Sequence, residues 1–198
     1  RGKPITTWTH PGRARRVVLS RDGRRAYVIA GEVLYARDAA TGEILAQAPL
    51  GAVGWDLALL ANETVIATLA DDHRAMLWDA ATLTPRPGVR PFPDQLRELL
   101  VIDDRLVIAS PDDVLIIDVD GKVRGRASQE ATLAVAWSGR DQFAVASTIG
   151  DLVLRRTDDA SLVRRWRIDD GIAALAYRPD GALLASASGR RVRIWDPA

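Results

Sequence analysis

A polar β-turn recurs five times along this chain, at intervals of 37 to 41 residues. A short apolar run precedes each turn and another follows it, and a third apolar run then usually ends in an aspartate. The five turns are Arg21-Asp22-Gly23, Asn62-Glu63, Asp103-Asp104, Gly139-Arg140-Asp141 and Pro179-Asp180-Gly181. Self-similarity at such a period predicts a solenoid, a propeller or another array of one repeated supersecondary unit.

The apolar runs have the length and composition of β-strands. They are rich in Val, Ile, Leu and Ala and are bounded by Gly, Asp and Asn, which favour turns. Runs such as 106–109 and 114–117 are apolar at every position, so both faces of their sheets should be buried. Blades stacked radially bury both faces of each sheet. We therefore predict an all-β propeller of four-stranded antiparallel blades, built from five repeats.

The third run of two repeats ends in a Trp-Asp pair, at Trp78-Asp79 and at Trp195-Asp196. Together with segments 15–45 and 173–196, these pairs make the chain resemble a WD-repeat (WD40) β-propeller over essentially its whole length. Gly54-Trp55-Asp56 is not another such pair, because it opens the first strand of its repeat.

The resemblance implies structural roles for Trp78, Asp79, Trp195 and Asp196. It implies one for His10 too, which lies where the family places the histidine of a Gly-His pair, bonded to a Ser or Thr, an Asp and the Trp of the same blade. The other repeats lack this histidine, so apolar packing and backbone ladders should hold most blades together.

The repeats are expected at about 13–50, 51–93, 94–128, 129–169 and 170–198, the last completed by 1–12. Gly2 to Thr9 resembles the outermost strand that the last repeat lacks, so the N-terminal strand would complete the last blade and latch the ring. Five repeats fit either a closed five-blade ring or an arc of a larger propeller. One domain is expected, and because the chain begins at Arg1 we expect it to be a piece of a longer polypeptide.

Composition excludes several classes of protein. The chain has no Cys, so disulfides and thiol catalysis are excluded, and it has no run of eighteen apolar residues that would predict a transmembrane helix. Lys3 and Lys122 are the only lysines among 27 basic residues, a bias that suggests a GC-rich, bacterial genome. We expect a cytoplasmic protein without membrane contact, cofactor or metal.

Charge is distributed unevenly along the chain. Residues 1–37 carry nine basic and two acidic side chains, residues 38–120 carry five and fifteen, and residues 121–198 carry thirteen and nine. In the family geometry one rim is formed by the loops that lead into first strands and by the hairpins between second and third strands. We predict a dipolar rim, with a basic sector of Arg13, Arg15, Arg16, Arg190 and Arg191 and an acidic sector of Asp71, Asp72, Asp94, Asp112 and Asp113.

Two interpretations of this rim stay open. Aspartates commonly form hairpin turns, and surface arginines can serve solubility alone. Alternatively, the basic sector docks an acidic segment of a partner, or copies of the chain associate with opposite sectors facing, because complementary potentials orient an encounter.

Residues 84–93 hold four prolines where the outer strand of the second repeat belongs. Proline cannot sit in a paired interior strand, which predicts a poorly paired edge followed by a loop. The alternative is an extended peptide offered to a partner, with Phe92 as its anchor beside Pro87, Pro91 and Pro93.

Catalysis and nucleic-acid binding are weaker hypotheses. A Ser-His-Asp site needs a histidine base, but His10 has a structural role in the family and His73 lies in a turn, so no catalytic residue is assigned. Asp71-Asp72-His73 lacks a second cluster of metal ligands. Arg164-Arg165-Trp166-Arg167 mixes cations with an aromatic, but strand alternation should send Arg165 and Arg167 to one face and Trp166 to the other, and the net charge is only +1.

The resemblance implies a noncatalytic scaffold that binds a protein or peptide partner, as the sensor or regulatory WD40 region of a larger protein. Fold alone specifies no particular function. The alternatives are a propeller enzyme with a polar site at its channel mouth and, with less support, arginine-mediated binding of nucleic acid.

Overall fold

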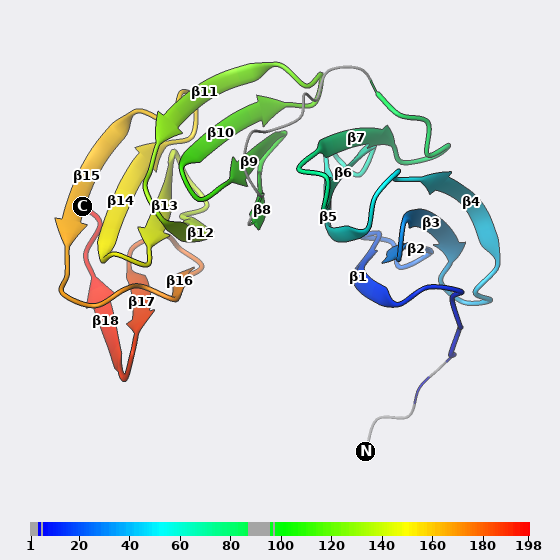
Figure 1. Ribbon diagram of the computed structural model, residues 1–198, viewed down its shortest axis with the longest axis horizontal. Coiled ribbons are helices and arrows are strands. Elements are labelled where there is room, and N and C mark those ends of the chain that lie inside the picture. The colour runs from blue at the N-terminus through cyan, green and yellow to red at the C-terminus, as the bar shows by residue number, and fades with distance from the viewer. Residues whose placement is uncertain (1–3, 5, 87–95, 97) are drawn as a thin grey trace. The chain divides into compact units, whose positions relative to one another are not determined.

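A computed structural model describes residues 4, 6–86, 96 and 98–198. Those residues form eighteen β-strands in five antiparallel sheets, without a helix (Figure 1). The prediction of an all-β repeat is therefore confirmed. The chain divides into two compact units, Arg1–Pro93 with Val119–Gly121, and Asp94–Asp118 with Lys122–Ala198.

The first unit contains two sheets whose strands pair in chain order. The strands of the first sheet are β1 (Ala14–Leu19), β2 (Arg25–Ala30), β3 (Val33–Asp38) and β4 (Ile44–Pro49), and those of the second are β5 (Gly54–Leu60), β6 (Val65–Ala70) and β7 (Ala75–Asp79). Strands β1 and β2 contact β5, so the two sheets pack face to face.

The second unit contains three sheets. Their strands are β8 (Glu98–Ile102), β9 (Arg105–Ala109), β10 (Asp113–Asp118) and β11 (Val123–Ser128); β12 (Thr132–Trp137), β13 (Gln142–Ser147), β14 (Asp151–Arg156) and β15 (Leu162–Arg167); and β16 (Ala174–Tyr177), β17 (Leu184–Ser188) and β18 (Arg191–Trp195). Strand β12 contacts both β8 and β16, so its sheet lies between the other two.

The recurrent turns join the first and second strands of their sheets. The amide of Gly23 donates to the carbonyl of Ser20 at 2.9 Å, and the amide of Gly181 donates to that of Arg178 at 2.8 Å. Both glycines have positive φ, 68° and 72°, a conformation that costs glycine little. In other repeats Asn62 takes the same left-handed region with φ of 50°.

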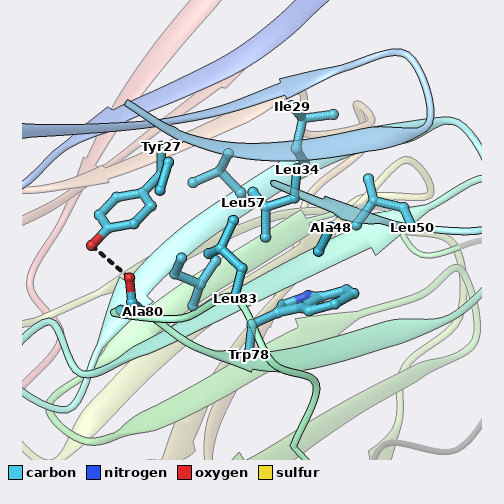
Figure 2. Close-up of a cluster of buried hydrophobic side chains, with 11 residues drawn as sticks. Tyr27, Ile29, Leu34, Ala48, Leu50, Leu57, Trp78, Ala80 and Leu83 are labelled. Atoms are coloured by element: carbon cyan, nitrogen blue, oxygen red, sulfur yellow. Dashed lines mark hydrogen bonds between the residues drawn. The ribbon is translucent and has the colours of Figure 1, made fainter. Parts of the chain in front are cut away.

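The core of the first unit lies between its sheets. Tyr27 and Leu34 of the first sheet approach Leu57 and Trp78 of the second, all of them buried (Figure 2). The hydroxyl of Tyr27 donates to the carbonyl of Ala80 at 3.0 Å, so the one polar atom that this ring buries is satisfied. Apolar packing therefore joins the two sheets of this unit.

Backbone hydrogen bonds also join neighbouring sheets, always where a hairpin meets the segment leading into the next sheet. In the first unit the amide of Gly54 donates to the carbonyl of Gly31 at 3.0 Å. In the second unit the amide of Gln129 donates to the carbonyl of Asp112, and the amide of Ile172 to that of Ser147, each at 2.9 Å. The same main-chain contact therefore recurs in both units.

Each sheet lies inside the bounds of one expected repeat. Three sheets have four strands, while the second and the last have three among the described residues. In the second sheet Pro85 makes an isolated bridge with Trp78, and the amide of Arg86 donates to Leu77 at 2.7 Å, so a short edge begins where it was expected. Pro87, Pro91, Phe92, Pro93 and Asp94 lie outside the described residues.

The latch between the two ends of the chain is not shown. Thr6 to His10 form no strand, and residues 1–3 and 5 lie outside the described part. Closure of a ring, the N-terminal strand that would complete the last blade, and the grouping of the repeats into one domain stay predictions. Within the described ranges, a search for a helix long and apolar enough to cross a bilayer finds none.

Candidate functional site

The two Trp-Asp pairs make hydrogen bonds to residues close to them in their own sheets. The indole of Trp78 donates to the hydroxyl of Thr68 at 2.9 Å, and the indole of Trp195 donates to that of Ser186 at the same distance. Asp79 accepts from the amide of Thr82 at 3.0 Å, and this bond is the main reason that its pKa lies below the usual range. Each pair therefore ties its third strand to the strand or turn beside it.

Trp55 lies in β5, the first strand of its sheet, as the position of Gly54-Trp55-Asp56 predicted. Asp196 accepts from the amide of Ala198 at 3.0 Å. Its bond therefore closes a turn after the third strand, as the bond of Asp79 does.

His10 lies in the segment leading into β1, but its partners differ from those that the family implies. Its ring packs on Tyr35, with ring centroids 4.9 Å apart and an interplanar angle of 59°. Its Nδ1 lies 3.5 Å from Nη2 of Arg37, which is only 7% exposed. Arg37 also donates to the carbonyl of Thr9 at 3.2 Å and to that of Gly42 at 2.5 Å. An arginine therefore replaces the family's polar network in this sheet.

Arg155 repeats this arrangement in the second unit. The buried guanidinium donates to the carbonyl of Ala160 at 3.0 Å, to the carbonyl of Ser128 at 3.2 Å and to Oε1 of Gln129 at 3.3 Å. Burial is the main reason that the pKa of Arg155 is lowered, and the charge of Arg165 adds to the effect. One side chain thereby fastens the hairpin that follows β14 to the end of β11 in the preceding sheet.

Sequence reasoning missed Arg37 and Arg155, although a signal was present. Arg37 stands before Asp38 as Trp78 stands before Asp79, so an arginine occupies the position of the signature tryptophan. Arg37 and Arg155 are each the last but one residue of a third strand, and each donates to a carbonyl of the chain that precedes its own sheet. When the repeats are aligned by their turns, an arginine at the position of the signature tryptophan indicates this contact with the preceding chain.

Protonation of His10 should oppose folding. Burial, followed by the charge of Arg37, lowers the pKa of His10 below 6.5 in the folded chain. A group whose folded pKa is depressed binds protons more readily when unfolded, so its contribution to stability is full above pH 6.5 and falls as the pH drops through and below that value. Urea unfolding at several pH values between about 7.5 and about 5, a range that spans the ordinary histidine pKa, checks this. His10→Gln should flatten the slope, and an equally steep slope in that variant would contradict the assignment.

In the first unit, ion pairs hold some of the predicted rim residues. Arg16 pairs with Asp56 of the neighbouring sheet, with Nε and Oδ1 2.8 Å apart, and Asp72 pairs with Arg74. The side chains of Arg13, Arg15 and Asp71 are exposed. Arg16 therefore fastens two blades together, a role that sequence reasoning did not assign to it.

In the second unit, Asp113 is buried and pairs with Arg126 of β11, and Arg191 pairs with Asp170 at 3.3 Å. Asp112 and Arg190 are exposed. Partners of opposite charge within the chain are therefore present for Arg16, Asp72, Asp113 and Arg191. The dipolar rim itself stays a prediction.

Strand β15 uses its arginines within its own sheet. Arg165 donates a hydrogen bond to the buried carboxylate of Asp151 at 3.0 Å, and Arg167 forms an ion pair with the same carboxylate at 3.1 Å. On the opposite face, Trp166 packs on Trp195 with ring centroids 5.5 Å apart. The predicted alternation is confirmed, and two of the cations considered for nucleic-acid binding already have an anionic partner.

A cavity of about 420 Å³ opens in the second unit. It lies where the turn between β12 and β13 and the turn between β16 and β17 meet the residues that follow β18. Polar side chains that line it are Ser138, Arg140, Asp141, Gln142, Tyr177 and Asp196. The sequence predicted both turns, but it did not predict that they lie next to each other in the fold.

Two features bring these turns together. Ser138 donates to the carbonyl of Gln142 at 2.6 Å and accepts from the amide of Arg140 at 3.2 Å, which fixes the first turn. Gly181 belongs to the second turn, and a Cβ there would lie only 2.3 Å from the carbonyl oxygen of Ser138. Glycine is therefore required both for its positive φ and for this close approach.

Tyr177 is one of the residues that line the cavity. Its hydroxyl is buried and has no hydrogen-bond partner among the described residues. Burial raises the pKa of Tyr177 to about 12, so the phenol stays neutral and can donate or accept a hydrogen bond near pH 7. Arg140 and Asp141 place a cation and an anion at the same cavity. The cavity can thus both donate hydrogen bonds to a ligand and accept hydrogen bonds from it.

Comparisons with known proteins agree with the fold. Residues 162–196 match the family model described as WD domain, G-beta repeat. Among solved structures, the crystal structure of the computationally designed Ika8 protein matches with a TM-score of 0.80 and 16% sequence identity. The match covers 94% of this chain and 59% of that one. No curated protein matches the chain.

The family match also shows how sequence repeat and sheet are offset. Residues 162–196 run from β15, the outer strand of one sheet, through the three strands β16, β17 and β18 of the next. One sequence repeat therefore spans two neighbouring sheets. Residues 162–196 form a WD40 repeat, within an all-β array of five similar sheets.

Proposed function

We propose that this chain is a noncatalytic protein-interaction scaffold, and that it binds a peptide segment of a partner protein in the cavity at Tyr177. WD40 repeats support protein interaction in general, and residues 162–196 form such a repeat. The chain spans 59% of the designed structure that it resembles. We further propose that it works as the sensor or regulatory region of a larger protein.

The buried hydroxyl of Tyr177 carries this proposal. A buried polar atom without a partner costs about 1–3 kcal/mol, and folded proteins seldom leave one without a reason. The hydroxyl is covered in the free chain, so the cavity would open on binding to let a peptide amide or carbonyl reach it and offset this cost. Arg140 and Asp141 would then hold polar or charged side chains of the same peptide.

Peptides selected from a random displayed library on the immobilised chain test the proposal. Their affinities are then measured by calorimetry for the wild type and for Tyr177→Phe. Loss of one hydrogen bond should weaken binding about tenfold. The free energy of unfolding should stay unchanged or rise, because Phe removes a buried polar atom that has no partner.

Arg178→Ala supplies the matched control. Arg178 lies in the same turn but bonds Asp180, with Nε and Oδ1 2.7 Å apart, and does not line the cavity. This variant should bind the selected peptides as the wild type does. Peptides that bind Tyr177→Phe with unchanged affinity would show that the cavity is not their site.

A further inference from the structure

Arg37 and Arg155 make equivalent contacts through the same nitrogen atoms, one arginine in each unit. Nη1 of each arginine donates to a carbonyl in the turn that follows its own strand. Nη2 of each donates to the chain that precedes its sheet, to the carbonyl of Thr9 in one unit and to that of Ser128 in the other, both at 3.2 Å. The segment before the first sheet is therefore held as the end of β11 is held in the second unit.

The next residue along the chain differs between the two contacts. Nη2 of Arg155 also donates to Oε1 of Gln129 at 3.3 Å, whereas Nη2 of Arg37 lies 3.5 Å from Nδ1 of His10. The amide oxygen of Gln129 can accept this bond at any ordinary pH, but Nδ1 of His10 can accept it only while it carries no proton. The first unit therefore makes a titratable version of a contact that the second unit makes with an amide.

Aromatic rings add to the contact in the first unit. The ring of His10 packs on Tyr35, and the guanidinium carbon of Arg37 lies 6.0 Å from the ring centroid of Trp8. A Cβ on Gly42 would collide with this indole, so glycine allows Trp8 to lie against the turn between β3 and β4. Among the described residues, Arg37 and Tyr35 are the titratable groups that face His10.

We infer that protonation of His10 releases residues 6–10, here called the strap, from the first sheet while the sheets stay folded. A protonated imidazole presents a donor and a like charge to Arg37, so the hydrogen bond is lost and the two cations repel each other. The release is local, because the core of the first unit, as far as the structure describes it, includes neither Trp8 nor His10. The inference is independent of the dipolar rim and of the Tyr177 cavity.

The pH dependence of this release has a definite sign. Burial, followed by the charge of Arg37, lowers the pKa of His10 below 6.5 while the strap is bound. Binding of the strap is therefore at full strength above pH 6.5 and weakens as the pH falls through and below that value. The equilibrium constant for binding should fall by up to about tenfold for each pH unit in that range, because one proton is taken up on release.

Spin labelling tests this inference, because the chain has no cysteine and takes a label only where one is introduced. A nitroxide on Thr9→Cys reports on the strap, and one on Ser128→Cys reports on the corresponding contact beside Gln129; both side chains are exposed. Electron paramagnetic resonance should show restricted motion at position 9 near pH ~7.5 and a growing mobile fraction toward pH ~5. The spectrum of the label at position 128 should stay the same.

His10→Gln is the matched variant, because it places at position 10 the residue type that the second unit uses at position 129. In this variant the label at position 9 should stay restricted down to pH ~5, and far-UV circular dichroism should stay constant in every labelled protein. Motion at position 9 that does not change with pH would overturn the inference, as would equal release in His10→Gln. Simultaneous release of both labels would also overturn it, because the whole chain would then be unfolding.

Discussion

Replacing Arg155 with Met should lower the free energy of unfolding by about 3 kcal/mol, because three charge-assisted hydrogen bonds are lost inside the second unit. The acceptors are the carbonyls of Ala160 and Ser128 and the amide oxygen of Gln129. Met fills much of the same space but leaves these oxygens without a donor. Arg155→Lys should recover little of the loss, since one ammonium cannot span three separated acceptors as a planar guanidinium does. Urea unfolding followed by circular dichroism measures the change.

Arg156→Met is the matched control for this prediction. Arg156 is the neighbouring residue, and its exposed side chain lies 3.6 Å from Asp158, which is also exposed. Surface ion pairs of this kind contribute about 0–1 kcal/mol. If Arg155→Met proved as stable as Arg156→Met, the arginine would not be holding the two sheets together.

Replacing Trp78 with Ala should cost the first unit about 3–5 kcal/mol, the usual range for deleting a fully buried large aromatic side chain. Trp78 lies between the two sheets of the unit beside Leu57 and Leu83 (Figure 2). Trp78→Phe keeps most of the ring but leaves the buried hydroxyl of Thr68 without its donor, for a smaller loss of about 1–3 kcal/mol. Thermal and urea unfolding of the three proteins would give this order.

Trp55 provides the comparison, because it belongs to the Trp-Asp sequence that is not part of the repeat signature. It is only partly buried on the first strand of its sheet. Trp55→Ala should therefore destabilise the chain less than Trp78→Ala. The opposite order would mean that the repeats had been aligned incorrectly.

Local properties of the chain were predictable because they depend on neighbouring residues. Turn residues such as Gly23 and Gly181 marked the hairpins, and short apolar runs marked the strands. Strand alternation correctly sent Arg165 and Trp166 to opposite faces of β15. These rules act over a few residues, so no knowledge of the tertiary structure was needed.

The partners of the charged residues could not be predicted, because ion pairs form between residues that only folding brings together. Asp113 was assigned to an acidic rim, but Arg126 pairs with it across two strands. Arg16 was assigned to a basic rim, but Asp56 of the next sheet takes up its charge. A count of charged residues along a sequence therefore overestimates the number of surface charges that are left without an ion-pair partner.

The sequence alone determined the repeat, its strands and the WD40 character of its last copy, because period and turn chemistry are local properties of the chain. Only the tertiary structure decided which groups meet. It placed Arg155 across two sheets and brought two distant turns together beside Tyr177. Each of these results depends on the packing of segments far apart in sequence, which no local pattern specifies.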